Sequence, residues 1–200
     1  MLNEKKIING CKKSDKNAQR ILYEQYSPLM RGLCQRYIGS ASLAEDIMHE
    51  GFIKVFTNIN QYKGIGSFEG WIKRIMINTS ISYIKNNEKH NRSKSFEEIS
   101  ELHIKSISED YEIDTENVDA KSLILHSDFS KEEIMEVVRE LPDGYRMVFN
   151  LYAVEGYKHK EIAEMLGIDT NTSKSQYSRA RAVIREKLEK LGKMKTRYTE

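Results

Sequence analysis

Apolar residues in this chain recur every three or four positions, and no segment alternates in steps of two over a useful length. Spacing of three or four places side chains on one face of an α-helix, whereas a half-buried strand needs alternation. The chain of 200 residues has only two prolines and eleven glycines to interrupt such helices. The sequence therefore predicts an all-α fold.

Three helical stripes occupy the first half of the chain. Pro28 marks a kink or a fresh start in the first stripe, and Gly39 ends it. The glycine-containing loop NQYKGIGS separates the second stripe from a third helix expected at residues 68–85. The stripes are Ile21, Leu22, Tyr26, Leu29, Leu33 and Tyr37; Ala44, Ile47, Met48, Phe52, Val55, Phe56 and Ile59; and Phe68, Ile72, Ile75 and Thr79.

Charge divides the chain into three parts. Residues 1–94 carry 16 Lys and Arg against 8 Asp and Glu, residues 95–130 carry 2 against 10, and residues 131–200 carry 14 against 12. The middle part is also rich in serine and weakly periodic, as flexible linkers are. We expect two small helical domains, at 1–94 and 130–200, joined by an acidic flexible linker at 95–129.

Several classes of function have little support. No apolar run approaches the roughly 18 residues of a membrane span and the N-terminus lacks a signal-peptide core, so we expect a cytoplasmic protein without membrane insertion. Cys11 and Cys34 are expected to be reduced packing residues. The five histidines lack the spacing of metal ligands, and no GK[ST] phosphate-binding loop occurs. We therefore expect no bound metal, no cofactor and no enzymatic activity.

The stretch KEIAEMLGIDTNTSKSQYSRARAVIREKL is typical of a helix-turn-helix. Gly167 suits a left-handed helix end, and Asp169 is placed to cap the next helix. Small polar residues open that helix and arginines follow, which favours contact with base edges and phosphates. The alternative is an ordinary helical hairpin with a solvated basic face. The second helix is expected to bury Ser173, Tyr177, Ala180, Ile184 and Leu188.

A wider pattern resembles bacterial RNA polymerase sigma factors of the extracytoplasmic-function (ECF) group. From residue 141 to 188 the segments LP, EG, EIAE, LG, TSKS and RAR follow the order found in their promoter-binding domain. AEDIMHEGFIKVF is similar to their polymerase-binding helix, and SFEGWIKRIMINTSISYIKN to the helix that meets the upper promoter element. Departures occur at Ser173, where the family often has Val, at Gln176, where it often has Arg, and at Ser82 and Lys85, which replace an Asp-x-x-Arg arrangement.

The resemblance implies a factor that binds core RNA polymerase, recognises double-stranded and melted promoter DNA, directs transcription initiation and is controlled by an anti-sigma factor. The resemblance implies that Asp46, His49, Glu50 and Ile53 bind polymerase. His49 could instead be a solvated surface residue, and Trp71, implied below for DNA, could instead be a core residue. The residues implied for upper-promoter DNA and melting are Tyr62, Lys63, Ser67, Phe68, Trp71, Lys73, Arg74, Asn78, Tyr83 and Lys85. Those for DNA binding by the helix-turn-helix are Lys158, Asn171, Thr172, Lys174, Ser175, Gln176, Ser178, Arg179 and Arg181.

Two other functions stay open at this point. A response-regulator-like activator can carry a similar helix-turn-helix, but it would need a receiver domain of alternating strands and helices, and residues 1–94 show no strand pattern. A helical module that binds only protein would show no salt-dependent affinity for DNA. The resemblance also implies that the acidic linker threads toward the polymerase active centre, whereas composition alone favours a solubilising tether.

Overall fold

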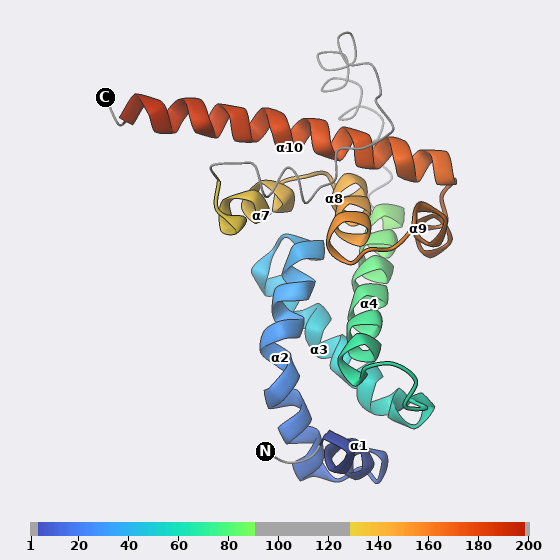
Figure 1. The fold of residues 1–200 in the computed structure, drawn as a ribbon. Helices are drawn as coiled ribbons and strands as arrows, with labels where there is room; N and C mark the ends of the chain where they lie inside the picture. The colour runs from blue at the N-terminus through green and yellow to red at the C-terminus, as the bar shows by residue number, and fades with distance from the viewer. Residues whose placement is uncertain (1–3, 91–128, 199–200) are drawn as a thin grey trace. The chain divides into compact units, whose positions relative to one another are not determined.

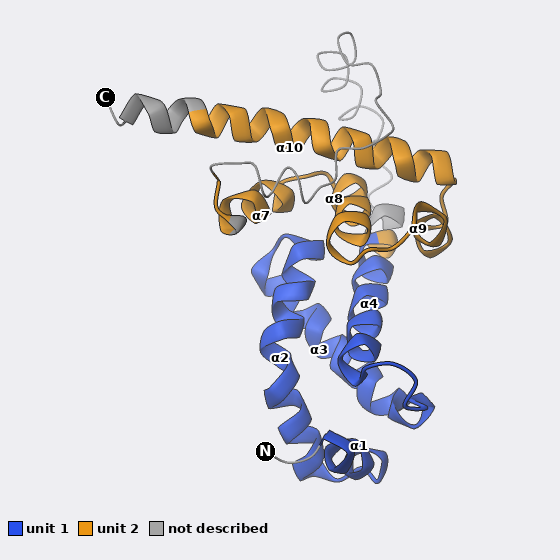
Figure 2. Ribbon diagram, in the orientation of Figure 1, with its two compact units in different colours: residues 1–84 blue, residues 85–200 orange. Residues whose placement is uncertain are grey.

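The computed structural model describes residues 4–90 and 129–198, and every regular element in these ranges is a helix (Figure 1). The all-α prediction is confirmed. The chain divides into two compact units, residues 1–84 and residues 85–200 (Figure 2). No helix within the described ranges is long and apolar enough to cross a membrane. The predicted linker lies outside the described residues except for Phe129, so its boundaries stay a prediction.

The first unit is built from α1 (Glu4–Lys12), α2 (Lys16–Ile38), α3 (Ala41–Asn58), the short 3-10 helix η1 (Ile59–Gln61) and the greater part of α4 (Phe68–His90). Most residues of the apolar stripes predicted from the sequence meet in one core between these helices. Leu29 is an exception, because it is 43% exposed on α2. The fully buried side chains of the core include Leu22, Met30, Leu33, Tyr37, Ile59, Phe68, Ile72, Met76 and Ile77.

Helix α2 continues through Pro28, so the fresh start allowed by the sequence does not occur. Pro28 is exposed, and the carbonyl that its missing N–H leaves unpaired can therefore bond to water. Asp15 begins the helix by accepting a hydrogen bond from the Ala18 amide at 2.8 Å. Gly39 ends it with a φ of 77°, as the sequence predicts.

The second unit contains α7 (Lys131–Arg139), α8 (Asp143–Phe149), the π-helical turn η2 (Asn150–Val154), α9 (His159–Leu166) and α10 (Thr170–Tyr198). A capping box between Ser130 and Glu133 begins α7. Buried Arg146 holds the next connection, because its guanidinium donates to the carbonyls of Arg139 at 2.9 Å and Leu141 at 2.7 Å. The sequence indicates these helices but not the π-helical turn.

Candidate functional site

One face of α3 carries the four residues implied for polymerase binding. Asp46, His49, Glu50 and Ile53 are all exposed, and their spacing of three, four and seven places them in a single stripe. Ile53 keeps 65% of its surface exposed, which is unusual for a large aliphatic residue. The opposite side of α3 packs into the core. The structure thus brings these four residues together on an open surface.

Two of these side chains are held by neighbours. Nε2 of His49 lies 2.9 Å from the hydroxyl oxygen of Tyr23 on α2. Glu50 forms an ion pair with Lys54 at 2.6 Å, one helical turn further along α3. Tyr23 itself packs against Phe52 with ring centroids 4.8 Å apart. His49 is therefore exposed but oriented, a contact between helices that the sequence does not reveal.

The loop between η1 and α4 is a turn stabilised by two glycines and a hydrogen bond across it. Gly64 and Gly66 have φ of 77° and 75°, a backbone conformation that residues other than glycine rarely adopt. The Tyr62 hydroxyl donates to the Gly66 carbonyl at 2.9 Å, which fastens the two ends of the turn together. Ile65, at its tip, is 84% exposed. The loop, defined here as residues 62–67, is an ordered projection with an apolar tip.

An aromatic cluster lies at the base of this loop. Tyr62, Phe68 and Trp71 have ring centroids 5.0 to 5.6 Å apart, and the rings of Phe68 and Trp71 are stacked. Phe68 is only 1% exposed. It therefore forms the buried part of the cluster, whereas Tyr62 and Trp71 are half-buried.

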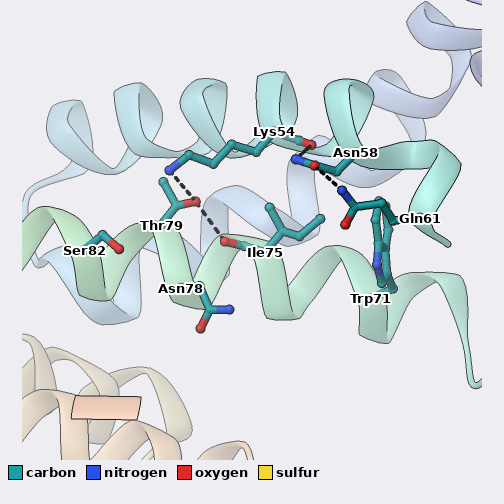
Figure 3. Close-up of a pocket in the computed structure, with 8 residues that line it drawn as sticks. All are labelled: Lys54, Asn58, Gln61, Trp71, Ile75, Asn78, Thr79 and Ser82. Atoms are coloured by element: carbon teal, nitrogen blue, oxygen red, sulfur yellow. Dashed lines mark hydrogen bonds between the residues drawn. The ribbon is translucent and has the colours of Figure 1, made fainter. Parts of the chain in front are cut away.

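A polar pocket of about 310 Å³ lies between α3 and α4. Figure 3 shows Lys54 and Asn58 entering from α3, and the Lys54 ammonium donating to Thr79 Oγ1 at 3.3 Å. The Gln61 amide donates to Asn58 Oδ1 at 2.9 Å and closes one end. The pocket is lined by Lys54, Asn58, Gln61, Trp71, Ile75, Asn78, Thr79 and Ser82. Of these, the sequence analysis named only Trp71 and Asn78 as site residues.

Helix α4 brings some of the predicted DNA-contacting residues together and separates others. Trp71, Arg74 and Asn78 follow one another at three- and four-residue spacing and share a face, and Lys85 falls on the same face seven residues further along α4. Lys73 lies to the side of that face and pairs with Glu69 at 2.7 Å. The remaining predicted residues on this surface are Lys63 and Ser67 in the loop, which are exposed, and Tyr83, which lies off the shared face.

The helix-turn-helix forms as the sequence predicts. Gly167 adopts the left-handed conformation after α9, with φ 66° and ψ 38°. Asp169 Oδ1 accepts a hydrogen bond from the Asn171 amide at 2.7 Å and so caps α10. The residues expected to be buried on α10 are buried: Ser173, Tyr177, Ala180, Ile184 and Leu188.

The front of α10 presents a polar and basic surface. Asn171, Thr172, Lys174, Ser175 and Arg179 are exposed there, as is Lys158 at the start of α9, and Ser178 is half-buried. Two predicted residues lie at the margins of this surface. Arg181 is half-buried with its guanidinium 5.8 Å from the Tyr177 ring centroid, and Gln176 is half-buried on the side nearer the core, with Oε1 screened from solvent.

A histidine joins the two helices of this element. Nδ1 of His159, the first residue of α9, lies 2.9 Å from the hydroxyl of fully buried Ser173 on α10. Its ring stacks on Tyr152 at 4.3 Å between centroids. Burial, and then the nearby charge of Lys174, lower the pKa of His159 below its ordinary value of 6.5.

We predict that His159 makes the second unit less stable in mild acid. The unfolded chain takes up a proton on His159 more readily than the folded chain, so stability falls as pH drops below about 6.5. His159→Phe keeps a stacking ring without a titrating group, and should narrow the difference in Tm between pH 8 and pH 5.5. Parallel pH curves for His159→Phe and wild type would contradict the assignment.

Comparison with known proteins gives this architecture a family. Residues 22–90 match Sigma-70 region 2, and residues 131–184 match Sigma-70 region 4. The ECF RNA polymerase sigma-E factor of Haemophilus influenzae is 26% identical over 192 residues, which cover 95% of this chain and 97% of the relative. The sigma-E factor of Escherichia coli K12 is 25% identical over 190 residues, covering 95% and 96%.

The fold has a counterpart among solved structures. The sigma factor RpoE of Bartonella quintana, crystallised with the anti-sigma factor NepR, superposes with a TM-score of 0.50 at 16% identity, covering 86% of this chain and 96% of that one. The helix-turn-helix and the two matched Sigma-70 regions together place the chain among DNA-binding transcription factors. The chain belongs to the sigma-70 family and is an RNA polymerase sigma factor of the ECF group. Sigma factors direct transcription initiation at promoters and are not enzymes.

Proposed function

We propose that this sigma factor divides its task among three surfaces. The exposed α3 stripe binds core RNA polymerase, the α4 face with loop 62–67 binds and opens promoter DNA, and the front of α10 reads an upstream element. The observation that carries the proposal is the difference in composition between the first two surfaces. The α3 stripe combines acidic residues with one exposed aliphatic, whereas the α4 face combines basic, amide and aromatic side chains.

The α3 stripe suits a protein partner. Ile53 supplies an apolar contact that gains free energy when covered, and the acidic side chains around it favour a basic partner surface. The hydrogen bond between Tyr23 and His49 restricts the rotamer of His49, so less side-chain entropy is lost when the partner binds. We therefore assign Asp46, His49, Glu50 and Ile53 to the contact with core polymerase.

The α4 face suits a strand whose bases have been unpaired. Trp71 and Tyr62 offer ring surface for stacking, Arg74 offers charge to phosphates, and Asn78 offers an amide to a base edge. The Lys85 ammonium donates instead to the Met165 carbonyl at 3.1 Å. The polar pocket beside these residues can accept an extruded base, because its amides and hydroxyls supply both donors and acceptors. Stacking and hydrogen bonding there would offset the few kcal/mol lost when a base leaves the duplex.

Asn78 should matter more for DNA opening than for polymerase binding. Asn78→Ala removes the exposed amide from the α4 face without disturbing the core. We expect the fraction of open promoter, measured by permanganate reactivity of unpaired thymines, to fall several-fold while affinity for core polymerase stays unchanged. Asn87→Ala is the matched control, since Asn87 is an exposed amide on another side of α4. A normal bubble with Asn78→Ala would remove this role.

The front of α10 suits the major groove. Its first turns carry short polar side chains, which let the helix approach base edges closely, and Lys158 and Arg179 lie where phosphates can be reached. We assign base reading to Asn171, Thr172, Lys174 and Ser175, and backbone anchoring to Arg179 and Arg181. Gln176 and Ser178 lie at the edge of this contact.

Control and location follow from the same proposal. The Bartonella quintana structure pairs a sigma factor with an anti-sigma factor, and we propose an anti-sigma partner for this chain as well. Because transcription takes place beside the chromosome, we propose that the protein acts in the cytoplasm. The proposal also assigns a role to each part of the chain. Residues 1–94 form the polymerase-binding and melting domain, residues 95–129 the acidic linker, and residues 130–200 the promoter-binding domain.

A further inference from the structure

Helix α1 precedes the residues that match Sigma-70 region 2, yet it is an integral part of the first unit. Ile7, Ile8 and Cys11 are buried, and Gly10 lies directly against α2. A Cβ atom at Gly10 would come within 2.5 Å of the Ala18 Cβ, closer than packed atoms approach. The helix is therefore fixed at a short distance from α2.

Polar contacts extend from α1 toward the loop. At its N-terminal end, Glu4 Oε2 accepts a hydrogen bond from Tyr26 at 2.9 Å, and the Tyr26 ring meets the edge of Phe68 at 5.9 Å. At its last residue, the Lys12 ammonium donates to the Tyr62 carbonyl at 3.0 Å. These two residues are 50 positions apart in the sequence. Both ends of α1 thus reach the aromatic cluster or the loop above it.

The hydrogen bond from Lys12 holds the backbone of Tyr62, the first residue of the loop. Tyr62 donates its backbone N–H to the Ile59 carbonyl and its hydroxyl to the Gly66 carbonyl, while its ring packs on Phe68 and Trp71. Its own carbonyl is satisfied by Lys12. Fixing that peptide unit fixes where the ring and the exposed loop tip point, and a charged donor makes this a stronger hydrogen bond than a neutral one would.

We propose that Lys12 is a positioning residue for promoter opening: through the Tyr62 carbonyl it holds loop 62–67 and the Tyr62 ring ready to receive an unpaired base. The proposal rests on the role proposed above for the loop. It assigns α1 a part in DNA melting without direct contact with DNA. A loop held in place before binding loses less conformational entropy when the base arrives, so opening is faster.

The test compares opening of duplex and pre-melted promoters by reconstituted holoenzyme. Lys12→Met keeps the aliphatic stem but removes the donor. We expect it to slow opening of duplex DNA by roughly tenfold, the effect of losing one charge-assisted hydrogen bond. Binding to core polymerase should stay unchanged. On a template with a pre-formed bubble the variant should initiate as wild type does, because melting is no longer required. A general loss of folding would impair both templates.

Further variants decide the outcome. Lys12→Arg retains a donor and should recover most of the rate, whereas Lys6→Met removes an exposed α1 lysine and should have no effect. Gly10→Leu should displace α1 and reproduce the duplex-specific defect. The inference about Lys12 would be overturned if Lys12→Met opened duplex DNA at the wild-type rate while deletion of residues 64–66 slowed opening. If the deletion also opens DNA normally, the proposed role of the loop fails instead.

Discussion

Reversal of charge at both Asp46 and Glu50 should weaken binding to core RNA polymerase by at least about 2 kcal/mol, more than about 20-fold in Kd. Both carboxylates are exposed on the α3 stripe beside Ile53, so Asp46→Lys with Glu50→Lys changes the surface without opening a cavity. The reversed charges would face a partner surface complementary to the acids, and juxtaposed like charges are costly. Binding of fluorescently labelled factor to core polymerase measures the effect.

A matched reversal on another part of α3 supplies the control. Glu45 is exposed but lies outside the predicted stripe, and Glu45→Lys should bind core polymerase nearly as well as wild type. The double variant should also retain the wild-type helical content, because neither carboxylate is in the core, and loss of the exposed Glu50–Lys54 ion pair should lower stability by only about 0.5 kcal/mol. Unchanged affinity in a folded double variant would show that the polymerase contact lies elsewhere.

Variants at Asn171 and Arg179 should alter DNA binding in two different ways. Asn171→Ala removes an exposed amide from the front of α10 and should change which upstream sequence is preferred, at about 1 to 3 kcal/mol for the base concerned. Arg179→Ala should weaken binding to all sequences alike and reduce the slope of log affinity against log salt by about one. Binding selections on random duplexes at two salt concentrations measure both effects.

The comparison between the two variants is its own control. A further control is Glu189, which is exposed on α10 but lies far along the helix from Asn171 and Arg179. Glu189→Ala should therefore leave sequence preference unchanged. If Arg179→Ala altered the preferred sequence while Asn171→Ala weakened every sequence equally, α10 would enter the groove in another orientation.

Local patterns in the sequence were sufficient to predict the helix-turn-helix. Gly167 and Asp169 determine where its helices stop and start, and the buried positions of α10 follow from helical spacing alone. The same is true of the α3 stripe, whose four residues are close in sequence. Such features depend on interactions within about one or two turns, which a single sequence displays directly.

Contacts between distant segments could not be predicted in this way. Lys12 with Tyr62, Tyr23 with His49, and His159 with Ser173 each join residues on different helices. Helix α1 is short and has only three buried positions, too few for helical spacing alone to predict it. The helical spacing predicts Ile75 in the core, but it is half-buried and lines the pocket between α3 and α4.

Initiation from a promoter library tests the central claim most directly. Core polymerase would be mixed with wild-type factor, Asn171→Ala or Asn78→Ala, on templates randomised in both the upstream and the melted element. We expect initiation that requires the factor and enriches two separate sequence blocks, with Asn171→Ala changing only the upstream block and Asn78→Ala only the melted one. Initiation independent of the factor, or a change in the same block by both variants, would contradict the claim.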